Sequence, residues 1–194
     1  MAKKTVVKDN VTSIKGEVVV STYKGDKLVT KKKMHNNAVA NMLVGIARFL
    51  RGDFLHLGEE SKSCLPLYLG VGFTNDVAVT QFDAKSLASE LSSYTYRFDI
   101  SKGDISIDTT NNQVRLSLSA VIPSGTFVSG TEINEIGLFS QRATKSSGLL
   151  ARVVYLTDAG RPATSTNDST GKNHIIIKTG MSERIDWTII LSNK

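Results

Sequence analysis

The feature that most constrains the fold is an alternation of apolar and polar residues that recurs along much of the 194-residue chain. It is clearest in residues 94–100 (YTYRFDI), 114–122 (VRLSLSAVI) and 185–192 (IDWTIILS). Apolar side chains at every second position are typical of a strand that buries one face. The sequence therefore predicts a mainly β protein, an antiparallel β-sandwich of roughly eight to nine strands.

One stretch has a different period. Residues 37–51, NAVANMLVGIARFLR, carry apolar residues at spacings of three and four, which predicts one amphipathic helix. Asn36 or Asn37 is expected to cap the start of this helix, and Gly52 to follow its end. A helix with such an apolar stripe normally packs on a core, so we expect it to lie against the sheet.

The segments between these patterns predict a single domain. No proline- or glycine-rich linker divides residues 1–194. The turn KGDK at 24–27 lies between two strand-like runs and predicts a basic hairpin over about residues 14–33, with Gly25 free to take a positive φ. Residues 157–173 have no apolar pattern and predict a long flexible loop, either a mobile tip or an arm that a partner orders. The runs after this loop, 174–180 and 183–192, are expected to pair as closing strands.

Charge is concentrated at the N-terminus. The net charge is +6, and the first 35 residues, with nine lysines and three acidic residues, account for all of it. One interpretation is a basic patch for nucleic acid or for an acidic protein partner. The other is a solvated hairpin whose lysines discourage pairing at a sheet edge. Arginines interleaved with aromatic rings, which would stack on bases, are missing here, so we do not expect nucleic acid as a partner.

Metal and cofactor chemistry is not indicated. His35, His56 and His174 show no metal-binding spacing, and Cys64 is the only cysteine. The run GVGFTN at 70–75 has two glycines of a dinucleotide motif but lacks the third. We therefore expect neither a metal site nor a cofactor.

Acid–base catalysis is not expected either. Glu132 and Glu135 could lie near Asp186 only if particular strands are neighbours. A sugar-cleaving site also needs a carboxylate pair at a defined separation, usually with exposed aromatic rings. Aromatic residues make up only 7% of the chain, so we do not expect an enzyme. The N-terminus lacks the apolar core of a signal peptide, and the longest apolar run is too short for a membrane span.

Four segments in order carry a resemblance to a known family. They are residues 34–50 (MHNNAVANMLVGIARFL), 65–75 (LPLYLGVGFTN), 87–91 (LASEL), and the pair INEIGLFS…LLARVVY with IDWTIIL near the C-terminus. Together they resemble small tail, baseplate or fibre-associated structural proteins of tailed bacteriophages. In that family an arginine often follows the third segment closely, whereas the next one here is Arg97.

The resemblance implies a virion structural protein with a β-sandwich core. It would be made in the host cytoplasm, reside in the tail or baseplate, and assemble in multiple copies with itself and other virion proteins. A carbohydrate- or receptor-binding module of a tail fibre is the alternative. The residues expected to make contacts in the assembly are Lys31, Lys32, Lys33, Arg161, Asn167, Asp168 and Lys172.

Three further residues are expected to act as structural motifs rather than as catalytic groups: Glu135, Gly137 and Trp187. Strand alternation places Glu135 and Gly137 on the face opposite Ile136. A buried carboxylate needs a backbone N–H or a cation, and Arg152 on the next predicted strand is a candidate partner for Glu135. Trp187 alternates with isoleucines and is expected to face the core.

Overall fold

The structure is a computed structural model that describes residues 11–38, 67–72, 97–140, 149–154 and 174–193. These residues form eleven strands and no helix, and every strand pairing is antiparallel. The strands are β1 (Val11–Lys24), β2 (Lys27–Ala38), β3 (Tyr68–Gly72), β4 (Arg97–Asp99), β5 (Lys102–Asp108), β6 (Gln113–Ile122), β7 (Glu132–Ile133), β8 (Glu135–Phe139), β9 (Leu149–Val154), β10 (Ile175–Ile176) and β11 (Met181–Asn193). The mainly β, antiparallel prediction is confirmed, but a sandwich of eight to nine strands is not.

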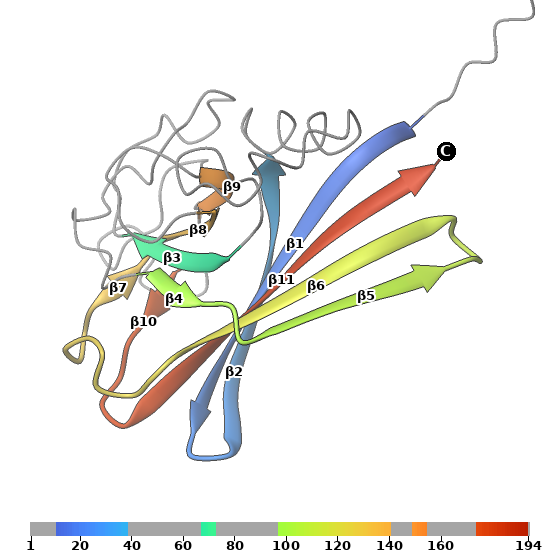
Figure 1. Cartoon of the computed structure of the whole chain (residues 1–194). Coiled ribbons are helices and arrows are strands. Elements are labelled where there is room, and N and C mark those ends of the chain that lie inside the picture. Colours follow the sequence, from blue (N-terminus) through green and yellow to red (C-terminus); the bar gives the residue numbers. More distant parts are fainter. Residues whose placement is uncertain (1–10, 39–66, 73–96, 141–148, 155–173, 194) are drawn as a thin grey trace, which may run out of the picture.

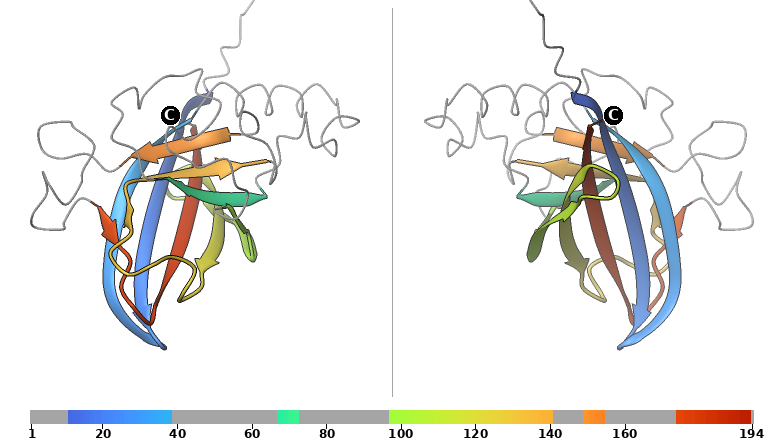
Figure 2. Two further views of the ribbon diagram at one scale, coloured as in Figure 1. Left: turned by 90° about the vertical axis from the view of Figure 1, so that its left-hand side faces the viewer. Right: turned by 90° about the vertical axis from the view of Figure 1, so that its right-hand side faces the viewer.

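Nine strands form one hydrogen-bonded series in the order β4-β3-β8-β9-β2-β1-β11-β6-β5, and β10 and β7 form a separate pair. Strand β2 connects two sets of strands, because it pairs with β1 up to Asn36 and with β9 at Asn37 and Ala38. We call β2, β1, β11, β6 and β5 the long-strand half, and β4, β3, β8 and β9 the short-strand half. The short strands run across the long ones when the molecule is viewed from the side (Figures 1 and 2).

The core lies between these two halves. A single cluster of buried apolar side chains takes Val18, Leu118 and Trp187 from the long-strand half and Leu69 and Ile136 from the short-strand half. Trp187 stands opposite Val18 on one side and Leu118 on the other, so three neighbouring strands contribute to the same row. The predicted core position of Trp187 is confirmed.

The N-terminal hairpin is longer than predicted. Its turn is at KGDK with Gly25 at a φ of 57°, as expected, but strand pairing continues to Asn37 and Ala38. The prediction that Asn36 or Asn37 caps a helix is therefore wrong. Backbone pairing with β1 and β9 holds these residues in an extended strand through Ala38, so a helix cannot begin at either asparagine. The remaining residues of the predicted helix, 39–51, lie outside the described residues.

The expected pairing of the two C-terminal runs is also wrong. Strand β10 pairs with β7, through Ile175 opposite Ile133, whereas β11 lies between β1 and β6. A turn at Gly180, whose φ is 71°, separates β10 from β11. The 13-residue β11 buries more apolar surface between two long strands than it would beside the two-residue β10.

Strands β5 and β6 form a second hairpin. The turn lies at Asn111 and Asn112, with Asn112 at a φ of 51°. Asp108 ends β5 and accepts hydrogen bonds from the Asn111 side-chain amide (2.8 Å) and backbone N–H (3.0 Å). These hydrogen bonds hold the pKa of Asp108 below its usual value, so Asp108 is ionised at neutral pH.

Candidate functional site

Glu135, which the sequence predicts to be a structural rather than a catalytic residue, is one half of a buried ion pair. Its side chain is 0% exposed and accepts hydrogen bonds from Arg152 Nε at 2.8 Å and Nη2 at 2.5 Å. Arg152 comes from the neighbouring strand β9 and is only 5% exposed. The predicted partnership of Glu135 with Arg152 is confirmed, and Ile136 faces the core on the opposite side of β8.

The two glycines of GVG make room for this arrangement. A Cβ on Gly72 would lie 2.3 Å from Glu135 Oε1, and a Cβ on Gly70 would lie 2.6 Å from Cε2 of Phe139. The guanidinium of Arg97 lies 3.8 Å from the centroid of the same Phe139 ring, a cation–π contact. The glycines in β3 therefore allow close packing beside a charged and an aromatic side chain, and they do not form a phosphate loop.

The carboxylates considered as a catalytic pair do not converge. Glu135 is buried in β8, whereas Asp186 lies on the side of β11 that faces away from the core and accepts a hydrogen bond from Ser119 at 2.5 Å. Glu132 belongs to β7, in the separate two-stranded pair. This geometry does not provide the facing carboxylates that glycoside hydrolysis requires.

A second buried carboxylate, Glu183, was not among the predicted residues. Glu183 accepts a hydrogen bond of 2.6 Å from the hydroxyl of Thr22, which in turn accepts one from Thr30. The ammonium group of Lys32 lies in the same region and donates to the backbone carbonyl of His174. The burial of Glu183 could have been predicted from the sequence. Glu183 precedes Ile185 and Trp187 at every second position, so it must share their inward face.

Burial raises the pKa of Glu183 above the ordinary glutamate value of 4.5, and the hydrogen bond from Thr22 and the charge of Lys32 offset only part of this effect. A raised pKa means that the folded chain binds this proton more tightly than the unfolded chain does. The stabilisation of the folded state by this tighter proton binding is therefore complete at acid pH. It is lost as the pH rises from 4.5 through the raised pKa of Glu183 in the folded state.

We expect the Glu183→Gln variant to be more stable than the wild type at neutral pH and about equally stable below pH 4.5. Glutamine is a neutral isostere that avoids the cost of burying the ionised form. Urea unfolding at a series of pH values tests this, with Asp186→Asn as a control on a half-buried carboxylate that faces away from the core. Parallel stability curves for wild type and Glu183→Gln across the pH range would contradict the assignment.

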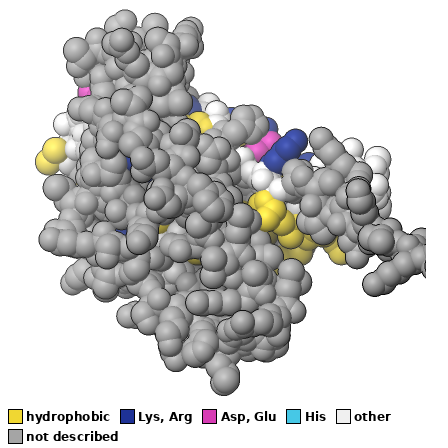
Figure 3. Space-filling view, turned by 90° about the horizontal axis from the view of Figure 1, so that it is seen from above, with side chains coloured by type: hydrophobic (Ala, Val, Ile, Leu, Met, Phe, Trp, Pro, Cys, Tyr) yellow, Lys and Arg dark blue, Asp and Glu magenta, His cyan; other side chains and the backbone are white. Residues whose placement is uncertain are grey.

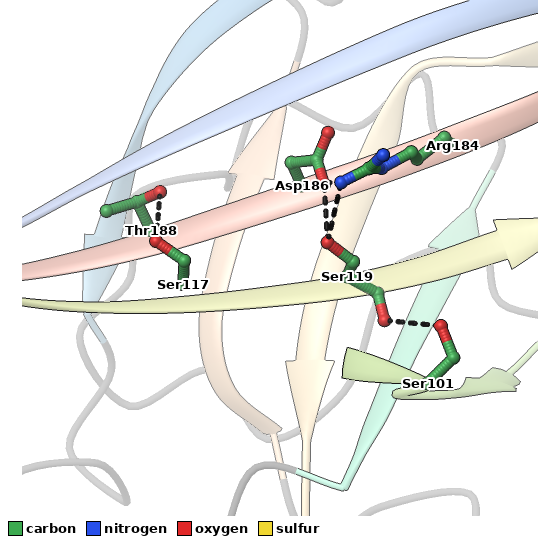
Figure 4. Close-up of polar contacts among 6 residues, drawn as sticks. All are labelled: Ser101, Ser117, Ser119, Arg184, Asp186 and Thr188. Carbon is green, nitrogen blue, oxygen red and sulfur yellow. Dashed lines mark hydrogen bonds and ion pairs between the residues drawn. The ribbon is translucent and has the colours of Figure 1, made fainter. Parts of the chain in front are cut away.

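The outward face of the long-strand half is polar around Ser119 and Asp186 (Figure 4). Asp186 accepts hydrogen bonds from the Ser119 hydroxyl and from Arg184 Nε, the latter at 2.8 Å. Ser117 and Thr188 place their hydroxyls 3.5 Å apart on the next rung of β6 and β11. Apart from the buried Ser119, these groups are half-buried or exposed, and they stand in rows across neighbouring strands. Such an arrangement suits contact with another polar surface.

The three predicted contact lysines of β2 point in two directions. Lys31 and Lys33 are exposed on the polar outward face, and Lys33 forms an ion pair with Glu17 at 2.9 Å. Lys32 stands opposite Val20, on the core side, and contacts the His174 carbonyl. The structure therefore separates Lys32 from the surface that Lys31 and Lys33 share. The other predicted contact residues lie outside the described residues: Arg161, Asn167, Asp168 and Lys172.

Metal-ligating side chains do not gather in the part of the chain that the structure describes, since no three histidine, cysteine or acidic residues there could hold an ion. Within the same residues, no helix is long and apolar enough to cross a membrane.

Comparison with models of known protein families finds no match to this chain. No curated protein and no solved structure matches it either. The functional interpretation therefore depends on the residues themselves and on the geometry described above.

Proposed function

We propose that this chain is a structural subunit of a bacteriophage particle, in the tail or baseplate, and that it assembles in multiple copies with other virion proteins. One observation carries the proposal: among the described residues that carry the resemblance to the phage family, the most distinctive ones lie in the interior. Glu135 and Trp187 are fully buried, and Gly72 provides the space that Glu135 occupies. A motif made of such residues specifies a fold rather than a reaction.

The exposed surfaces support the same proposal. The long-strand half carries rows of hydroxyls and charges on its outward face, together with exposed lysines on β2 and exposed isoleucines on β5. Repetition of such a surface by symmetry strengthens many weak contacts through avidity. In this proposal the two halves form a β-sandwich, the partners are further copies of the chain and other virion proteins, and the location is the virion.

A carbohydrate- or receptor-binding module remains the second candidate, but no observation favours it. Sugar recognition uses exposed aromatic rings, and Trp187 is buried in the core. A glycan array probed with the purified chain would detect such binding directly.

The proposal predicts that particles cannot be completed without this chain. A stop codon introduced into its gene is expected to leave infected cells with incomplete particles that lack a normal tail or baseplate in electron micrographs. A plasmid copy of the wild-type gene should restore them. Complete, infectious particles in the absence of the chain would contradict the proposal.

A further inference from the structure

Strand β5 is a long, exposed edge of the nine-stranded series. It is the last strand in the series, so one side of its backbone has no strand partner among the described residues. Its seven residues, KGDISID, include Ile105 at 69% exposure and Ile107 at 73%. An exposed edge with apolar side chains is a template for pairing with another chain.

The other strand edges in the described part of the chain differ from β5. Strand β4, at the opposite end of the series, has only three residues. The outer side of β2 carries exposed Lys31 and Lys33. Short length and lysines are the usual devices that keep an edge from pairing. Strand β5 has seven residues, and its single lysine, Lys102, stands at one end.

Apolar exposure continues from β5 across the sheet. Ile107 stands opposite Val114 of β6, and Val114 stands opposite Leu191 of β11. Val114 is 38% exposed and Leu191 40% exposed, so this row extends beyond the well-buried core. In the view from above, apolar side chains lie at the surface beside basic and acidic ones (Figure 3). Pairing at β5 would therefore extend this apolar face into a second copy of the chain.

The sequence of β5 is complementary to itself in one antiparallel register. If Ile105 of one copy faces Ile105 of a second copy, Lys102 faces Asp108 of that copy, and the same pair forms again on the other side of the axis. Gly103 then faces Ile107 of the second copy on the apolar side. Cross-strand pairs of opposite charge stabilise a sheet, and this register has no pair of like charges.

We propose that β5 is a self-association site, at which two copies pair their β5 strands antiparallel around a twofold axis at Ile105. The contact is isologous, since each copy contributes the same strand, and it joins two nine-stranded series into one continuous sheet. The inference deepens the proposed multi-copy assembly by naming the contact, but its test uses the purified full-length chain alone.

A disulfide test reports the register directly. In a background where Cys64 is replaced by serine, the Ile105→Cys variant is expected to form a disulfide-linked dimer under mild oxidation. The two Cα atoms would lie about 4.5–5.5 Å apart, within the roughly 4.4–6.8 Å that a disulfide spans. Ile107→Cys is the matched control, because it is similarly exposed but would be about 13 Å from its counterpart, four residues along the strand.

A charge exchange tests the same contact without a covalent bond. Lys102→Glu places two acidic side chains opposite each other and is expected to raise the dimer dissociation constant by about tenfold. Adding Asp108→Lys to it should restore association, whereas Lys31→Glu makes the same change of charge on β2 and should have no effect. Sedimentation equilibrium measures each constant, and circular dichroism confirms that each variant is folded.

Two results would overturn the proposal: a chain that stays monomeric and uncross-linked at high concentration, or equal cross-linking of Ile105→Cys and Ile107→Cys. These results are separate from the fate of the proposed function. A monomeric chain that is nevertheless essential for particles would remove the β5 contact and leave the structural role intact. A chain that dimerises through β5 but is not needed for particles would support the β5 contact and contradict the structural role.

Discussion

The Glu135→Gln variant is expected to lose about 3–5 kcal/mol of unfolding free energy, because it leaves a buried guanidinium without its counter-charge. Glu135 is fully buried, and Arg152, which donates two hydrogen bonds to it, is 5% exposed. Water cannot replace the lost carboxylate at such a site. Urea unfolding monitored by the fluorescence of Trp187, the only tryptophan, measures the loss.

A double-mutant cycle isolates this ion pair from other effects. Arg152→Met should lose a similar amount of unfolding free energy. The double variant Glu135→Gln/Arg152→Met should lose much less than the sum of the two single losses, because it buries no unpaired charge. Asp186→Asn breaks a more exposed pair with Arg184 and should cost less than about 1 kcal/mol. Additive losses for the buried pair would show that the two side chains do not depend on each other.

The Gly72→Ala variant is expected to lose about 3 kcal/mol, through overpacking and displacement of the ion pair. The added Cβ would lie 2.3 Å from Glu135 Oε1 and 2.6 Å from its Cγ. The Glu135 carboxylate is held by Arg152, so its side chain cannot move aside without breaking two hydrogen bonds. Urea unfolding of Gly72→Ala and the wild type gives the difference in free energy.

Gly103→Ala is the matched control for this change. It introduces the same methyl group in strand β5, where the nearest side-chain atom, Leu118 Cδ2, lies at an ordinary 3.5 Å. We expect Gly103→Ala to change stability by less than about 1 kcal/mol. In a Glu135→Ala background, Gly72→Ala should also become nearly neutral, because the clashing side chain is gone. Equal losses for Gly72→Ala and Gly103→Ala would mean that loss of glycine itself, rather than the contact with Glu135, sets the cost.

The local pattern of the chain was sufficient to predict several features. Alternation of period two identified the strand over residues 114–122 and the inward direction of Trp187. It also placed Glu135 and Ile136 on opposite faces of β8. A buried carboxylate at Glu135 needs a partner, and this need predicted a cation beside it. Each of these features depends on residues that are close in sequence or on a single adjacent strand.

Features that depend on distant pairing could not be predicted in this way. The choice of β7 rather than β11 as the partner of β10 depends on which strands compete for β11, and no local pattern contains that information. Likewise, the pairing of Asn37 with Arg152 overrides the capping preference of asparagine. Glu183 was in phase with an apolar face, but its role became clear only once Thr22 and Lys32 were found beside it.

The features that first suggested chemistry therefore have structural explanations in this fold. Glu135 neutralises a buried arginine, and the glycines of GVG accommodate Glu135 and Phe139. The surfaces left over, above all the edge of β5, are suited to contact with further copies or partners. The proposed role in a particle depends on these two features, the buried ion pair of the framework and the exposed edge of β5.

The measurement that tests this account most directly is the amount of the chain in purified particles. Quantitative mass spectrometry of density-purified virions should find it at a constant ratio to the other tail proteins, corresponding to several copies per particle. Its absence from purified virions, while it accumulates in the infected cell, would contradict the account.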